Sequence, residues 1–326
     1  MFKISKISLS FLLVSGFFVV GCGNPQSKLD KEVEQIPMEV VVERFDQEFY
    51  NGKDEDFQSL KAKFPYMFPE GVSDDAWLEK KKDTIFQELQ DEVTKQYADL
   101  GTLPEDLKRL FQYIKYYYPE ESADKKLITV LSEVDVSVKA IYADTLALVS
   151  LDTYLGSDHH FYKSFPAYTH TTFDRTQILP DMAESFVVQK LPKSMDRTFL
   201  GAMIQKGKMA YAKEALLPGV AKETLITYTK EEYAWCVANE AQVWRYFIDN
   251  QLMFDTDGKL AARFIDPAPF SKFYLDIDSE SPGRVGVWMG WQIVRSFMEN
   301  NNVTLQELFA MNAKDIFEKS KYKPKK

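Results

Sequence analysis

The stretch Arg284–Phe297, RVGVWMGWQIVRSF, carries two glycines in an otherwise largely apolar sequence. Gly286 and Gly290 are four residues apart, so in a helix they share one face. Without side chains there, the helix backbone can approach a neighbouring helix closely. The stretch therefore predicts a tightly packed helix pair.

Helical periodicity extends from this stretch over most of the chain. Apolar residues recur at helical spacing in three segments: 38–49, 77–97 and 107–117. The last of these segments lies between Pro104 and Pro119, which are a typical helix start and stop. Two further segments lack strand alternation and are expected to be helical: 181–191 and 198–217.

Local signals refine this pattern. Thr229 with Glu232, and Thr304 with Glu307, have the spacing of a capping box, and the first pair precedes an amphipathic stretch that ends near Met253. The period changes to two at 134–138, where valines alternate with polar residues, and a turn at 143–144 precedes the apolar run 146–151. This predicts a β-hairpin.

The N-terminus has the features of a lipoprotein signal peptide. Lys3 and Lys6 precede the apolar run Ile7–Val20, which as a helix would span about 21 Å, short of the ~30 Å membrane core. The run ends at Gly21-Cys22, which resembles a lipobox. We therefore expect a signal peptide over 1–21 and acylation of Cys22, which would anchor the protein to the membrane without spanning it.

The rest of the chain then divides as follows. Residues 22–37 read as a polar, lipidated tether, 38–318 as one α+β domain that is mostly helical with a small β-sheet, and 319–326 as a basic tail with five lysines that should be solvated. No internal repeat or linker divides the body, and no later stretch is apolar enough for a membrane span.

Composition excludes several functions. Lys and Arg number 40 against 49 Asp and Glu, a net charge of -9, which argues against nucleic-acid binding. Two cysteines exclude a disulfide framework and a cysteine-based zinc site. Cys236 lies in an apolar helical pattern, and we interpret it as a buried, inert thiol. No serine-hydrolase, P-loop or dinucleotide-binding motif occurs.

Three other groups of residues could bind a ligand. His159, His160 and His170 lack the i, i+4 spacing of a helical zinc pair, so solvated loop histidines are the preferred interpretation. The acidic segments 255–258 and 276–280 resemble fragments of calcium loops but lack the glutamate at position 12, which favours plain turns. The tyrosines at 113–118 could line a carbohydrate or peptide groove, although packing in a core is favoured. We expect no metal and no cofactor.

Several blocks, in order, resemble the gliding-motility lipoproteins of the GldB family of Bacteroidetes. They are FDQEFY (45–50), FSKF (270–273), DIDSESPGR (276–284), GWQIVRS (290–296) and KYKP (321–324). The resemblance covers essentially the whole chain and implies a lipid-anchored cell-envelope protein needed for gliding. It implies no known reaction.

That family is in turn similar to predicted zinc-dependent metallopeptidases with an H-E-x-x-H helix. The resemblance places Glu184 at the general-base position, Ala183 and Val187 at the two histidine positions, and Lys206 at the third ligand. It thus implies a degenerate zincin-like fold without its metal, in which Glu184 has a structural role, conceivably in an ion pair with Lys206.

We therefore expect a non-catalytic binding or assembly component of the gliding apparatus, facing the periplasm, in the inner or outer membrane. Its partners would be the membrane, through the acyl chains on Cys22, and other envelope proteins of the apparatus. Two alternatives stay open. One is an active zinc peptidase with relocated ligands, drawn from His159, His160 or His170 and a carboxylate. The other is a ligand-binding or glycan-binding lipoprotein that uses Tyr113–Tyr118.

Overall fold

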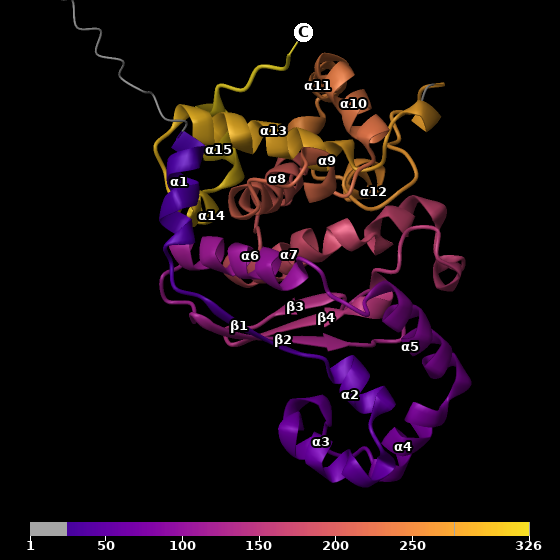
Figure 1. The fold of residues 1–326 in the computed structure, drawn as a ribbon. Helices are drawn as coiled ribbons and strands as arrows, with labels where there is room; N and C mark the ends of the chain where they lie inside the picture. Colours follow the sequence, from indigo (N-terminus) through magenta and orange to yellow (C-terminus); the bar gives the residue numbers. More distant parts are fainter. Residues whose placement is uncertain (1–24, 277, 326) are drawn as a thin grey trace, which may run out of the picture. The chain divides into compact units, whose positions relative to one another are not determined.

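The computed structural model describes residues 25–276 and 278–325, which contain a four-stranded mixed sheet (Figure 1). The strands are β1 Glu39–Glu43, β2 Asp124–Val130, β3 Ala140–Tyr142 and β4 Leu146–Ser150. Their order is β1-β2-β4-β3, with β1, β2 and β4 parallel and β3 antiparallel to β4. With the many helices around this small sheet, the predicted α+β class is confirmed.

The strand β1 corrects the sequence prediction, which placed a helix over 38–49. Three consecutive valines, Val40–Val42, form the strand, and the helix α2 Phe45–Asn51 begins only after it. β-Branched residues favour strands, and here the register Val42↔Leu127 pairs them with β2. The apolar spacing of residues 38–49 fits one continuous helix as well as a strand followed by a helix, so the periodicity alone gave the wrong prediction.

The predicted hairpin is right in its turn and second strand and wrong in its first strand. Ala143 N–H donates to the Leu146 carbonyl at 2.7 Å, and β3 pairs with β4. Residues 134–138 lie outside the sheet, in a loop that the buried carboxylate of Asp152 holds by accepting N–H bonds from Ser132 and Val134. The alternating valines at 134–138 therefore belong to a loop and not to a strand.

Helices of the first third form a lobe next to the sheet (Figure 1). They are α2 Phe45–Asn51, α3 Phe57–Lys63, α4 Asp74–Lys82 and α5 Thr84–Gln96. Phe45, Phe49, Phe57 and Phe64 join Ile128 and Val130 of β2 in one apolar cluster. The predicted continuous helix 77–97 is interrupted at Asp83, whose carboxylate accepts the N–H groups of Ile85 and Phe86 and so starts a new helix.

Two helices pack on the sheet from the other side, above it in Figure 1: α6 Leu103–Tyr117 and α7 Ile178–Lys190. The helix predicted between Pro104 and Pro119 is confirmed, and so is the helical segment 181–191. Aromatic edges join the layers, since the ring of Tyr142 in β3 lies 5.9 Å from Phe111 and 5.0 Å from Phe186. This packing fixes α7, which carries the candidate site.

The C-terminal half is helical. Its helices are α8 Phe199–Leu216, α9 Lys222–Leu225, α10 Lys230–Ala238, α11 Glu240–Asp249, α12 Lys259–Phe264, α13 Val285–Asn300, α14 Leu305–Ala310 and α15 Ala313–Ser320. The helix pair predicted from Gly286 and Gly290 is confirmed. Gly290 of α13 packs against the backbone of α8 at Met203 and Gly207, with no room for a side chain.

Both predicted capping boxes are present, at Thr229 with Glu232 and at Thr304 with Glu307. The amphipathic stretch after Thr229 is not one helix, because Asn239 separates α10 from α11. The C-terminal tail is also less solvated than expected. Ser320 is fully buried, and the Tyr322 hydroxyl donates to Glu240 at 2.6 Å.

Residues from Ile36 onward form one compact unit, and the helix α1 Pro25–Glu34 belongs to a separate unit that ends at Gln35. Within the described residues, the helices are all too short or too polar to cross a membrane. Cys22 and the predicted signal peptide lie outside the described part of the chain.

Candidate functional site

The candidate site is built on α7, where the resemblance to metallopeptidases would place a degenerate zinc helix. Ala183 and Val187, at the two histidine positions, are fully buried in the core. Their methyl groups cannot ligate a metal, and both side chains contribute to core packing. Asp181 and Glu184, one helical turn apart, lie on the partly exposed side of the same helix.

Glu184 forms an ion pair with Lys213 of α8, at 2.7 Å between Oε2 and Nζ. This corrects the expected pairing with Lys206, which is exposed. The Lys213 side chain is only 7% exposed, whereas that of Glu184 is 42% exposed. The Lys213 charge lowers the pKa of Glu184 below its usual value, against the opposing effect of burial, and Lys206 and Arg284 add smaller contributions. Glu184 is thus held as a carboxylate, and no general acid results.

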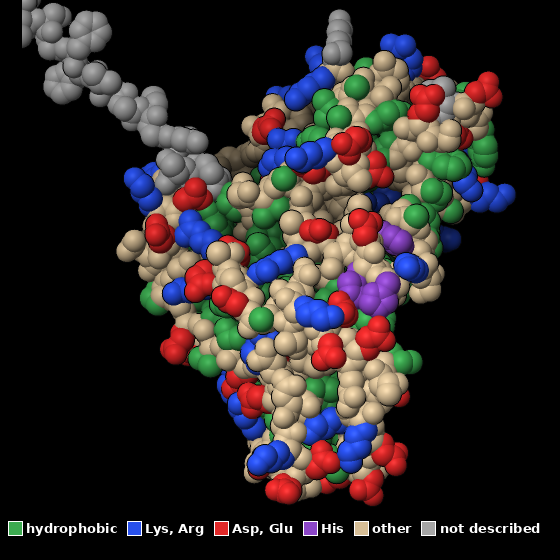
Figure 2. Space-filling view, turned by 45° about the vertical axis from the view of Figure 1, so that its right-hand side comes forward, with side chains coloured by type: hydrophobic (Ala, Val, Ile, Leu, Met, Phe, Trp, Pro, Cys, Tyr) green, Lys and Arg blue, Asp and Glu red, His purple; other side chains and the backbone are tan. Residues whose placement is uncertain are grey.

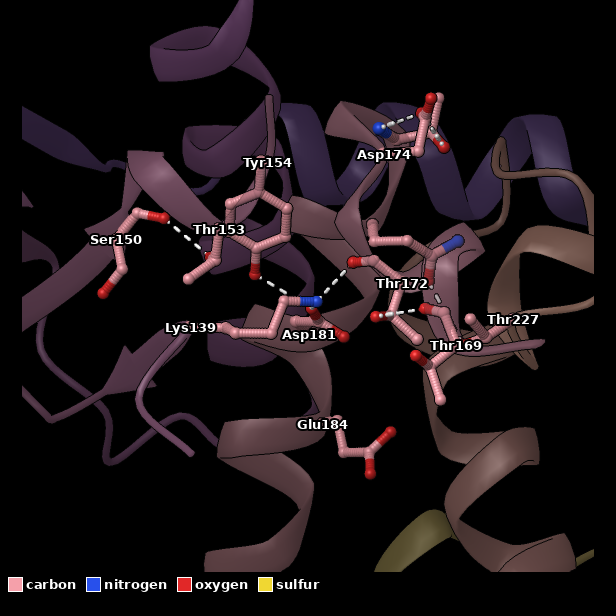
Figure 3. A network of polar contacts seen from close by, with 12 residues as sticks. Lys139, Ser150, Thr153, Tyr154, Thr169, Thr172, Asp174, Asp181, Glu184 and Thr227 are labelled. Atoms are coloured by element: carbon pink, nitrogen blue, oxygen red, sulfur yellow. Dashed lines mark hydrogen bonds and ion pairs between the residues drawn. The ribbon is translucent and has the colours of Figure 1, made fainter. Parts of the chain in front are cut away.

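Asp181 belongs to a second network that joins α7 to the sheet (Figure 3). Lys139, just before β3, places Nζ 2.7 Å from Asp181 Oδ2 and also donates to the carbonyl of Thr172. The hydroxyl of Tyr154 donates to the same Asp181 oxygen at 2.9 Å, and the Lys139 ammonium lies 4.6 Å from the Tyr154 ring. Figure 3 shows Glu184 on the same side of α7, outside this network.

A small hydroxyl-lined crevice of about 120 Å³ lies next to this network. Its walls come from the turn at 167–173, the segment at Thr227 and Tyr228, and the start of α13 at Gly283 and Arg284. Of the hydroxyls that Figure 3 shows here, Thr169 donates to Pro166 O and Thr172 to Thr169 O, each at 2.7 Å, and Thr227 donates to Gln177 Oε1 at 3.2 Å. Glu232 of α10 also lines the crevice, and its carboxylate accepts the Thr229 N–H at 2.8 Å.

Arg284 closes one end of the crevice. Its Nη2 donates to the carbonyls of Ile226 and Thr227 at 2.7 and 2.9 Å, and its guanidinium lies 5.2 Å from the Tyr228 ring. Behind Tyr228, Cys236 is buried, and this burial raises the pKa of its thiol strongly. The prediction of a buried thiol is therefore confirmed, and a thiolate nucleophile is disfavoured.

The three histidines gather on one face of the molecule (Figure 2) but do not form one cluster of ligands. His159 and His160 stack on each other, with ring centroids 4.5 Å apart, rather than pointing to opposite sides. They face α5, where His159 Nε2 lies 3.3 Å from Glu92 and His160 Nε2 lies 3.2 Å from Glu88. His170 instead contacts the Phe165 carbonyl at 3.0 Å.

Within the described residues, no three His, Cys, Asp or Glu side chains are grouped so as to hold a metal ion. The two calcium-like segments form turns. Asp255 accepts the Asp257 N–H at 2.9 Å, and Asp278 accepts the N–H groups of Phe273, Tyr274 and Leu275. Their carboxylates therefore accept hydrogen bonds from the backbone of their own loops.

The tyrosines at 113–118 do not form a binding surface as a group. Tyr113 and Tyr118 are buried, at 2% and 6% exposure, and Tyr116 is exposed at 39%. This supports the packing interpretation for Tyr113 and Tyr118.

Sequence reasoning missed most of the site. It identified Glu184 through a resemblance, but Lys213, Asp181, Lys139 and Tyr154 carry no local motif. Lys139 and Asp181 are 42 residues apart and meet only because β3 packs on α7. The one available signal was that Lys213 lies within the apolar pattern of α8, although the sequence does not distinguish it from Lys208, which is also buried there.

Comparison with known proteins adds a family. The sequence model of the family described as gliding motility protein GldB matches residues 26–324. Neither the comparison with curated proteins nor that with solved structures finds a match.

Proposed function

Because the chain belongs to the GldB family of gliding motility proteins, we propose that it is a lipid-anchored, non-catalytic component of a bacterial gliding apparatus. Acyl chains on Cys22 would hold it in the cell envelope of a member of the Bacteroidetes, with the folded body facing the periplasm. Other envelope proteins of the apparatus would be its partners. The family match supports the link to motility and to an envelope lipoprotein.

The observation that carries the non-catalytic part is the state of α7. Ala183 and Val187 are buried core residues, and the Glu184 carboxylate is neutralised by Lys213 at 2.7 Å. A hydrolytic carboxylate needs an activated water and a free lone pair to accept its proton. Glu184 instead forms an ion pair with Lys213 that links α7 to α8. We include in the proposal that the body is a degenerate zincin-like domain retained for binding or assembly.

The direct test is a motility assay with Glu184→Gln, in a gliding strain whose own copy is deleted. We expect normal gliding, because the glutamine keeps the shape of the side chain and nothing in the proposal needs its charge for chemistry. Glu231→Gln on the exposed face of α10 is the control for the same charge change. Loss of gliding in the Glu184 variant alone, at normal protein abundance, would show that the carboxylate has a chemical role.

The anchor is tested separately by Cys22→Ser. We expect the variant protein to leave the membrane fraction and gliding to be lost, since a single acylated cysteine is the proposed attachment. A strain that glides normally with its protein in the soluble fraction would remove the need for the anchor.

The zinc content of the purified protein tests the alternative of an active peptidase with relocated ligands. The His159–Glu92 and His160–Glu88 pairs are the nearest candidates for such ligands. We expect well under one zinc per chain after dialysis of the purified protein against trace zinc. About one zinc per chain, lost in His159→Ala, would establish a metal site and contradict the non-catalytic proposal.

A further inference from the structure

A second, unrelated site lies around Lys208, on the side of α8 that faces α14 and α15. The Lys208 side chain is buried at 5% exposure. Its Nζ donates to the carbonyls of Phe309 and Met311, at 3.1 and 2.6 Å, at the C-terminal end of α14. An ammonium has three donors, so these two bonds leave one N–H without an acceptor among the described residues.

Lys208 also lacks a carboxylate partner among the described residues. The other two buried lysines of the described chain have carboxylates nearby: Lys125 with Asp144 and Lys213 with Glu184. Lys208 forms no ion pair with a described carboxylate, and burial lowers the pKa of its ammonium to about 8. A buried cation without an anion is costly, and the carbonyls at the negative, C-terminal end of α14 offset only part of that cost.

Room is present. A pocket of about 230 Å³ borders Lys208, between the start of α8, the end of α14, the start of α15 and the loop 192–196. Gly201 in the first turn of α8 lines it, as do Asn312 and Ala313 at the start of α15; the side chains of Thr198 and Asn312 cap these two helix starts, and the C-terminal end of α14 lines the pocket as well. Exposed Lys193 adds a second cation at the rim.

The other residues that line the pocket indicate which kind of anion it could bind. Ile204, Phe309 and Ala313 give the pocket an apolar side, and Asp196 places one negative charge in its lining. That carboxylate disfavours a doubly charged phosphate, whereas a single negative charge on an apolar body is compatible with it. We propose that this pocket binds a monovalent carboxylate on a short apolar body, with Lys208 Nζ as its ionic partner.

Calorimetric titration of the full-length lipoprotein in nonionic detergent with sodium butyrate, at constant ionic strength, tests the proposal. We expect saturable binding of one butyrate per chain, and none of the uncharged butyramide. Lys208→Gln should weaken butyrate binding at least tenfold, because the amide can still donate to the Phe309 and Met311 carbonyls but carries no charge. Lys206→Gln, an exposed lysine on the same helix, should change it less than twofold.

Asp196→Asn provides a second variant that does not depend on the folding of the Lys208 variant. It keeps the oxygen that accepts the Thr198 N–H and removes the charge, so butyrate should bind several-fold more tightly. The proposal is overturned by the absence of saturable butyrate binding, by equal binding of butyrate and butyramide, or by an unchanged affinity in Asp196→Asn. Tighter binding of inorganic phosphate than of butyrate would overturn the choice of a carboxylate.

Discussion

Gly207 of α8 and Gly290 of α13 meet backbone to backbone. A Cβ atom on either glycine would lie closer to the carbonyl of the opposing helix than real Cβ atoms approach any heavy atom. The opposing helix backbone, rather than a mobile side chain, occupies the space, so neither helix can yield locally. The two helices that carry Lys213 and Arg284 are therefore locked at the distance these glycines set.

Gly290→Ala is expected to destabilise the protein by about 2 kcal/mol or more. Overpacking a tight contact typically costs 1–3 kcal/mol, and here it outweighs the gain in helix propensity of ~1 kcal/mol. Urea unfolding followed by tryptophan fluorescence measures the change. Gly219→Ala, where a Cβ meets no atom within 4 Å, should stay within about 0.5 kcal/mol of the parent. Equal effects of the two substitutions would contradict the close contact.

Removing the Glu184 charge should weaken the fold in a pH-dependent way. Glu184→Gln leaves the buried Lys213 ammonium without its partner, but Glu184 is 42% exposed and screened by solvent, so we expect a cost of about 1 kcal/mol at pH 7. Because the folded pKa of Glu184 lies below its unfolded value, this contribution is present above the unfolded value and is lost as pH falls through the folded pKa. A difference in unfolding free energy that persists at pH 2 would contradict this.

Asp152 has the opposite pH dependence. Complete burial raises its pKa from 3.8 to about 6, although N–H bonds from Ser132 and Val134 oppose the shift. The folded state therefore binds more protons than the unfolded state between these values, and stability falls as pH rises from about 4 to above 6. At ~1.4 kcal/mol per pKa unit, the loss is of the order of 3 kcal/mol.

Carbon-13 NMR of the aspartate carboxyl groups checks this value. Asp152 should titrate near pH 6, whereas the exposed Asp135 in the same loop, whose pKa is lowered by its hydrogen bonds from Ser137, should titrate below the usual aspartate range. Titration of both groups together would mean that the loop at 132–138 is open in solution.

Cys236 should be inert in the native protein. Its thiol is buried and its pKa is strongly raised, so almost no thiolate exists at pH 8. In the Cys22→Ser protein, we expect negligible reaction with a thiol reagent such as dithionitrobenzoate in buffer and one thiol per chain in urea. Rapid labelling of the native protein would place Cys236 at a surface that the structure does not show.

The sequence predicted those features that depend on neighbours along the chain. The capping boxes at Thr229 and Thr304, the helix after Pro104 and the glycine face at Gly286 and Gly290 all follow from spacing within one turn or one helix. The failures at β1 and at 134–138 have a common cause. Apolar spacing alone does not say which strand a segment pairs with, and pairing decides between strand, helix and turn.

The candidate site was less predictable for the same reason. Glu184 was identified, but its partner was not, because Lys206 and Lys213 are both lysines of α8 and only the packing of α7 on α8 selects Lys213. Lys208 had no distinguishing feature in the sequence. Its significance depends on the loop 192–196 just before α8 and on the ends of α14 and α15, which are about a hundred residues further along the chain.

The parallel pairing of β1 with β2 sets the order in which the chain can fold. Val42 pairs with Leu127, so more than eighty residues, including all of α2–α6, must be made before β1 finds its neighbour. Loop closure over that distance is slow, and until it happens the valines of β1 are an unprotected strand edge. A chaperone that covers the first hundred residues until β2 is available would therefore protect this strand from aggregation.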